Sequence, residues 1–121
     1  MPQITLEYTR NLQKNIDTKA FFIRLHQTIQ QVSDATIEGC KSRAYVLDEY
    51  CIGHGKENSA YAGLVIRLLA GREVAMKQAI GESALALLKQ FFLAADPTLR
   101  VFLTVEIRDM DPHAYFRYVR E

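Results

Sequence analysis

The chain has 121 residues, enough for one hydrophobic core but too few for two independent domains. Its 15 Lys and Arg residues nearly balance 14 Asp and Glu residues, giving a formal net charge of +1. This balance does not indicate a protein that binds nucleic acid or an anionic membrane surface. No apolar run approaches the ~20 residues of a membrane span, and Glu7 and Arg10 interrupt the region where a secretory signal would be apolar. We therefore expect a cytoplasmic protein.

The first half of the chain predicts a strand, a helix and a second strand. Residues 3 to 8 alternate in polarity, as a strand with one buried face does. Asp17 can cap a helix with an apolar stripe at three- and four-residue spacing. The stripe consists of Phe21, Phe22, Leu25, Ile29 and Val32. A second strand, rich in Tyr, Val and Leu, is predicted from about Ser42 to Tyr50, followed by a loop from Gly53 to Ser59.

The second half repeats this pattern. Tyr61 to Leu69 predicts a strand, and Ala70-Gly71-Arg72 turns into a second helix that Asp96-Pro97 ends. The apolar stripe of this helix is Met76, Ile80, Ala84, Leu87, Leu88, Phe91 and Ala95. Leu99 to Ile107 alternates most cleanly of all and predicts a strand with two different faces. An aromatic tail follows, with Tyr115, Phe116 and Tyr118.

Two strand-helix-strand units, about 2–58 and 60–121, predict a single α+β domain. We expect two βαβ repeats, each with parallel strands and a right-handed crossover, that form a four-stranded mixed sheet with both helices on one face. The other sheet face, with Phe102 and Thr104 among charged residues, then lacks a covering layer. That face and the aromatic tail indicate self-association.

Pro2 is the first candidate for chemistry. Removal of Met1 would leave Pro2 as a secondary amine, and alternation places it on the apolar side of the first strand with Ile4, Leu6 and Tyr8. Desolvation disfavours a charged amine, so a pKa shifted down from the α-amino value of ~8 would give a neutral base near physiological pH. The competing interpretation is that a proline at this position has no function, because a single residue is weak evidence for a motif.

Three cations are candidates for binding an anion. Arg72 follows Gly71 at the predicted start of the second helix, where unpaired N–H groups and a guanidinium could hold a carboxylate together. Alternatively, the neighbouring Glu73 simply neutralises Arg72. Lys41 and Arg43 share one face at the start of the second strand, where solvated cations are also common.

Neither metal binding nor a disulfide is indicated. Cys40 and Cys51 flank a predicted strand, too far apart to bridge, so we expect free thiols. The histidines, His26, His54 and His113, have no metal-ligand spacing with each other or with the cysteines. We expect no metal site and no organic cofactor.

Several motifs together resemble the tautomerase superfamily and, within it, the 5-carboxymethyl-2-hydroxymuconate Δ-isomerases. They are Met1-Pro2 with Glu7-Tyr8, Gly39 through Ser42-Arg43-Ala44, Leu47-Asp48, Gly55-Lys56, Ala70-Gly71-Arg72, Gly81-Glu82 with Leu87, and Glu106 and Pro112. The resemblance covers nearly the whole chain. It implies a tautomerase fold, like that of macrophage migration inhibitory factor, assembled as a homotrimer with active sites at subunit boundaries.

The resemblance also implies a chemistry. Pro2 would act as general base and then general acid on an unsaturated keto or enol diacid, and Arg72 would bind a carboxylate. Lys41 stands where the family has an arginine, which leaves the exact substrate open because a lysine offers no bidentate fork. Two alternatives remain. One is another superfamily activity, such as tautomerisation of phenylpyruvate-like keto acids, decarboxylation or hydration; the other is a non-catalytic trimeric binding protein that retains Met1.

Overall fold

The computed structural model describes residues 1–14, 16–93 and 96–121, so Asn15, Ala94 and the predicted helix position Ala95 lie outside the described residues. The strands are β1 (Gln3–Thr9), β2 (Lys41–Leu47), β3 (Ser59–Leu69) and β4 (Arg100–Met110). The helices are α1 (Thr18–Val32) and α2 (Val74–Phe92), with short 3-10 turns η1 (Arg10–Leu12) and η2 (Pro112–Ala114).

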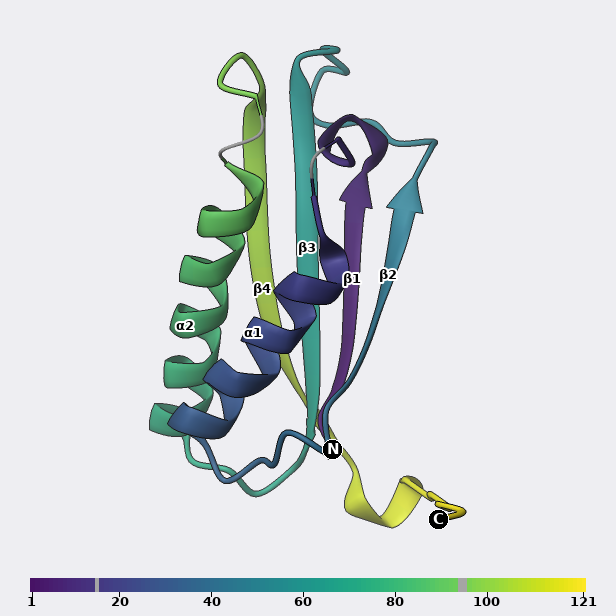
Figure 1. The fold of residues 1–121 in the computed structure, drawn as a ribbon, viewed down its shortest axis with the longest axis vertical. Coiled ribbons are helices and arrows are strands. Elements are labelled where there is room, and N and C mark those ends of the chain that lie inside the picture. Colours follow the sequence, from purple (N-terminus) through teal and green to yellow (C-terminus); the bar gives the residue numbers. More distant parts are fainter. Residues whose placement is uncertain (15, 94–95) are drawn as a thin grey trace.

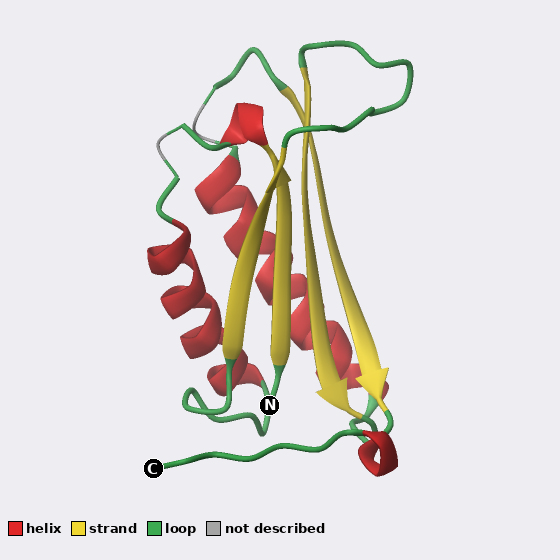
Figure 2. Ribbon diagram, turned by 90° about the vertical axis from the view of Figure 1, so that its right-hand side faces the viewer, coloured by secondary structure: helices red, strands yellow, loops and turns green. Residues whose placement is uncertain are grey.

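The four strands form one sheet in the order β2-β1-β3-β4. β1 runs parallel to β2, and β3 runs parallel to β4, whereas the central pair β1 and β3 is antiparallel. Both helices cover the same face of this sheet, and the other face stays open (Figures 1 and 2). The predicted α+β fold, with a mixed sheet and both helices on one face, is confirmed.

The core lies between the helices and the even-numbered residues of the central strands. The largest of these strand residues, all at most 1% exposed, are Ile4, Leu6, Leu64, Ile66 and Leu68. The apolar stripes of both helices pack on them, as the spacing predicted, and bury Phe21, Leu25, Ile29, Ile80 and Leu88. Where the two helices meet, the Phe21 ring contacts the rings of Phe91 and Phe92 edge-on, with centroids 5.4 and 5.8 Å away.

β2 is shorter than predicted, ending at Leu47 and not at Tyr50. Its one neighbour, β1, ends at Thr9, which is the residue paired with Leu47. Beyond that point the described residues offer β2 no strand on which to continue hydrogen bonding, and Asp48 forms an ion pair with Arg10. The length of the neighbouring strand, and not local propensity, sets this boundary.

The helix α1 begins as predicted, with the Asp17 carboxylate accepting a hydrogen bond from the Ala20 N–H at 3.0 Å. α2 begins two residues later than predicted, at Val74, with Glu73 as its N-cap residue. Gly71 has φ +120°, a conformation that a side chain would disfavour, and this turns the chain sharply out of β3. Arg72 therefore lies in the turn before the helix and not in its first turn.

A tail follows β4 and lies beyond the sheet. Figure 2 shows the tail running from the end of β4 beneath the sheet and past the amino terminus. Phe116 and Tyr118 are 88% and 86% exposed there. Phe102, predicted on the open face, is 38% exposed, with the Arg100 guanidinium stacked 5.0 Å from its ring centroid. In the described part of the chain, no helix is long and apolar enough to span a membrane.

Candidate active site

The amino end of β1 is held by backbone contacts. Pro2 is buried, as are Ile4 and Leu6, with which alternation predicted it to share a side. The Pro2 carbonyl accepts a hydrogen bond from the Lys41 N–H at 3.1 Å, and the Met1 amine donates to the Gly39 carbonyl. A Cβ atom added at Gly39 would lie only 2.6 Å from the Met1 carbonyl oxygen. The chain at Gly39 thus approaches Met1 so closely that a side chain would not fit.

The surroundings of the Met1 amine disfavour positive charge. Partial burial is the main reason that the pKa of this amine lies below 8.0, and the charge of Lys41 adds to the effect. Arg117 and Arg72 lower the pKa further, while Cys40 acts in the opposite direction. Three cations from separate parts of the chain therefore act on the same point, beside Pro2.

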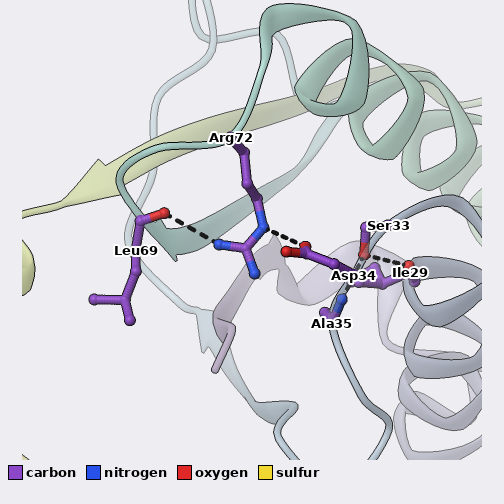
Figure 3. A network of polar contacts seen from close by, with 6 residues as sticks. All are labelled: Ile29, Ser33, Asp34, Ala35, Leu69 and Arg72. Atoms are coloured by element: carbon purple, nitrogen blue, oxygen red, sulfur yellow. Dashed lines mark hydrogen bonds and ion pairs between the residues drawn. The ribbon is translucent and has the colours of Figure 1, made fainter.

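Arg72 is held by a carboxylate and a backbone carbonyl, as Figure 3 shows. Its Nε donates to Asp34 Oδ1 at 2.8 Å, and its Nη1 donates to the Leu69 carbonyl at 3.1 Å. Its side chain is 16% exposed, whereas that of Asp34 is 63% exposed. Among the described residues, Glu73 forms no ion pair with Arg72, although the sequence offered it as the carboxylate that neutralises the arginine. Asp34, 38 positions away, pairs with Arg72 instead.

The turn after α1 places Asp34. The Ser33 hydroxyl donates to the Ile29 carbonyl at 2.6 Å, and its oxygen accepts from the Ala35 N–H at 3.1 Å (Figure 3). These two hydrogen bonds end α1 at Ser33 and fix both neighbours of Asp34, namely Ser33 and Ala35. The sequence analysis did not identify Asp34, and it named Gly39 only within a motif of the family resemblance. Both residues lie in a loop whose path depends on the packing of α1.

The predicted pair Lys41 and Arg43 takes different partners. The Lys41 ammonium donates to the Gly39 carbonyl at 3.1 Å, which keeps it at the amino terminus. Arg43 donates to Gln3 Oε1 and lines a hollow of about 490 Å³ on the open sheet face, together with Arg67 and Arg108. The described charges that act on the Met1 amine include Lys41 but not Arg43.

The tail contributes a residue that sequence reasoning also missed. Tyr115 Oη accepts a hydrogen bond from Gln3 Nε2 at 3.1 Å, and this contact fixes the tail next to the start of β1. Arg117, two residues further along, is the tail cation whose charge reaches the Met1 amine. The sequence offered a signal only in the aromatic residues around it, which were attributed to self-association.

The cysteines are free, as predicted: Cys40 is buried and Cys51 is exposed. Burial raises the pKa of the Cys40 thiol. His26 lies against β2, with its Nε2 2.7 Å from the Ser42 hydroxyl. Among the residues that the structure describes, no three His, Cys, Asp or Glu side chains come together in a way that could hold a metal ion.

Known proteins resemble this chain over nearly its full length. Residues 2–118 match the family described as 5-carboxymethyl-2-hydroxymuconate isomerase. A 5-carboxymethyl-2-hydroxymuconate Delta-isomerase of Escherichia coli is 24% identical over 117 residues, which are 97% of this chain and 93% of that protein. A crystal structure of a 5-carboxymethyl-2-hydroxymuconate isomerase from Deinococcus radiodurans R1 has a TM-score of 0.88 and 26% identity, covering 98% of this chain and 90% of that one. A fused 4-OT described as a symmetric trimer shares the fold, with a TM-score of 0.72 and 15% identity over 92% of this chain and 88% of that one.

Proposed function

The chain belongs to the 5-carboxymethyl-2-hydroxymuconate isomerase family, and from this premise we propose that it moves a proton along an unsaturated keto or enol carboxylate of that type, using Pro2. The resemblance to the tautomerase superfamily noted from the sequence is confirmed by the family match. The observation that carries the proposal is that Pro2 is buried and that the charges of Lys41, Arg72 and Arg117 all act on the amine beside it. Cations and burial at one amine favour both anion binding and a neutral base.

The proposed reaction begins at the Pro2 nitrogen once Met1 has been removed. The neutral amine takes a proton from an enol hydroxyl or from a carbon next to a carbonyl. Negative charge spreads along the conjugated chain, and the protonated Pro2 returns the proton at a distant carbon. The number of protons is unchanged, and the only σ bonds broken are those to hydrogen. The double bonds shift along the conjugated chain, and no electron acceptor is required. With Met1 retained, the nitrogen is part of an amide and cannot act as a base.

The cations hold the substrate and stabilise the charge that develops on it. Arg72 is fixed by Asp34 and Leu69 before a ligand arrives, which reduces the entropy lost on binding. Lys41 lies at the same end of β1 and attracts a second carboxylate as a point charge. Arg43 is directed toward the open sheet face, so we assign it a smaller part in binding.

We propose a homotrimer as the working assembly, located in the cytoplasm. The unpaired outer edges of β2 and β4, the open sheet face, and exposed Phe116 and Tyr118 are surfaces that a second copy would cover. The fused 4-OT, which shares this fold, is described as a symmetric trimer, and this supports three subunits for the proposed assembly. In this assembly, each chain supplies one Pro2.

Substrate profiling tests the proposed function. Purified enzyme lacking Met1, confirmed by intact mass, is assayed on 5-carboxymethyl-2-hydroxymuconate, on 2-hydroxymuconate and on the enol form of phenylpyruvate. We expect the highest kcat/KM for a muconate, because the charges of several cations act on the amino terminus. Faster turnover of phenylpyruvate would indicate the superfamily's keto-enol tautomerase activity instead. No turnover of any of the three would contradict the proposal.

A further inference from the structure

A hydrogen bond fixes the tail after β4 at the amino terminus, and this contact has no role in the proposed reaction as described above. Tyr115 is the tail aromatic that is only partly exposed, and its hydroxyl binds the Gln3 amide at 3.1 Å. Gln3 directly follows Pro2 and also binds Arg43 through its side-chain oxygen. Figure 2 shows the tail passing beneath the amino terminus. The contact therefore holds the following residues of the tail close to Pro2.

Arg117 is the tail residue whose charge acts there. It is exposed, and in the described part of the chain it forms no ion pair or side-chain hydrogen bond, unlike Arg72. An unpaired guanidinium offers its full set of N–H donors to a ligand, and a carboxylate can accept two of them in parallel. Arg117 could thus supply the bidentate contact that Lys41 cannot.

The chemistry of the substrate type calls for such a residue. A muconate has one carboxylate at each end, and a carboxymethyl substituent adds a third. Lys41 and Arg72 can account for two of them. Since Arg72 is already paired with Asp34, the positive charge left for the substrate is smaller than the count of three cations suggests.

We propose that Arg117 binds the third carboxylate, that of the carboxymethyl group, and so makes the site selective for tricarboxylates over dicarboxylates. The inference rests on the proposed function and adds a determinant of specificity to it. Gln3 and Tyr115 act as positioning residues, because their hydrogen bond holds the tail at the start of β1.

The test compares two substrates that differ by one carboxylate, 5-carboxymethyl-2-hydroxymuconate and 2-hydroxymuconate. Arg117→Ala should lower kcat/KM for the tricarboxylate about tenfold, mainly through KM, and leave the dicarboxylate within about twofold. Tenfold corresponds to about 1.4 kcal/mol. Arg120→Ala is the matched control, because Arg120 is an exposed arginine of the same tail that does not act on the Met1 amine. Tyr115→Phe should show a smaller loss with the same preference for one substrate.

A second readout does not depend on turnover. In an NMR titration of the processed amino terminus, Arg117→Ala should raise the pKa of the Pro2 amine, since a nearby cation has been removed. Arg120→Ala should leave that pKa unchanged. An unchanged titration in Arg117→Ala would mean that the tail does not stay at the amino terminus.

The outcomes separate this inference from the proposed function. An active enzyme in which Arg117→Ala loses activity equally on both substrates, or loses none, would overturn the inference and leave the proposed function standing. A wild-type enzyme inactive on both would contradict the proposed function. Calorimetric affinities for the two compounds would then decide the inference: it requires the tricarboxylate to bind more tightly, and Arg117→Ala to abolish that difference.

Discussion

Arg72 and Asp34, 38 positions apart in the sequence, form an ion pair whose Nε to Oδ1 distance is 2.8 Å, and this pair joins the turn before α2 to the turn after α1. The arginine is mostly buried and the aspartate mostly exposed. Because Asp34 stays open to solvent, the ion pair contributes little to stability, usually below about 1 kcal/mol. Its more important effect is to fix the direction of the guanidinium.

The first prediction concerns this pair. Arg72→Ala should lower kcat/KM on a muconate about 10²-fold, which corresponds to about 2.7 kcal/mol and is reasonable for one charge-assisted contact. Arg72→Lys should recover only part of the loss, because the planar fork is absent. Asp34→Asn should have a smaller effect, a few-fold rise in KM, since the Leu69 carbonyl still holds the arginine. Steady-state kinetics of the three variants measure these effects. If all three behave like the wild type, Arg72 has no role beyond the turn.

The second prediction concerns the space beside Pro2. Gly39→Ala should lower kcat/KM about tenfold, because the added methyl group would lie where the Met1 backbone now lies, next to the Pro2 nitrogen. Gly81→Ala is the matched control, since its added Cβ would meet only Ile107 Cγ1, at an ordinary 3.7 Å. Equal kinetics in the two variants would show that the substrate does not occupy the space at Gly39.

The strands and helices could be predicted from the sequence because their apolar periodicity is strong. Alternation in residues 3–8 and 99–107 and the stripes in both helices reflect burial on one face, and burial decides these elements. The end of β2 could not be predicted, because it depends on where β1 stops. The partners of Arg72 and the position of Arg117 depend on which loops the packed helices and the tail bring together. Such contacts leave no periodic signal.

The third prediction concerns assembly. The double variant Phe116→Ser, Tyr118→Ser should weaken the trimer. Both aromatic side chains are almost fully exposed on a single chain, so assembly would remove their apolar surface from water, and serine has little such surface to bury. Ile23→Ser, which replaces a 49% exposed residue of α1, is the control away from the tail. Sedimentation equilibrium over a micromolar range should show dissociation in the double variant only. A monomeric wild-type protein would contradict the proposed assembly.

The fourth prediction concerns pH and stability. Burial lowers the pKa of His26 from 6.5, so below that pH the unfolded chain binds a proton at this residue more readily than the folded chain does. The contribution of His26 to the free energy of unfolding should therefore fall as the pH drops from about 6.5. Urea unfolding at pH 7.5 and 5.5 should show a smaller loss in His26→Gln than in the wild type. An equal loss in both proteins would remove His26 as a cause.

The central claim is that the Pro2 amine carries the proton, and removal of Met1 tests it most directly. Two preparations of the same chain, one with Met1 and one without it by intact mass, are assayed on 5-carboxymethyl-2-hydroxymuconate between pH 5 and 9. The processed form should be active, with kcat/KM rising with pH through a pKa below the α-amino value of ~8, because burial and the nearby cations disfavour the charged amine. The form that retains Met1 should be folded but nearly inactive. Equal rates from the two preparations would contradict a role for Pro2 in the reaction.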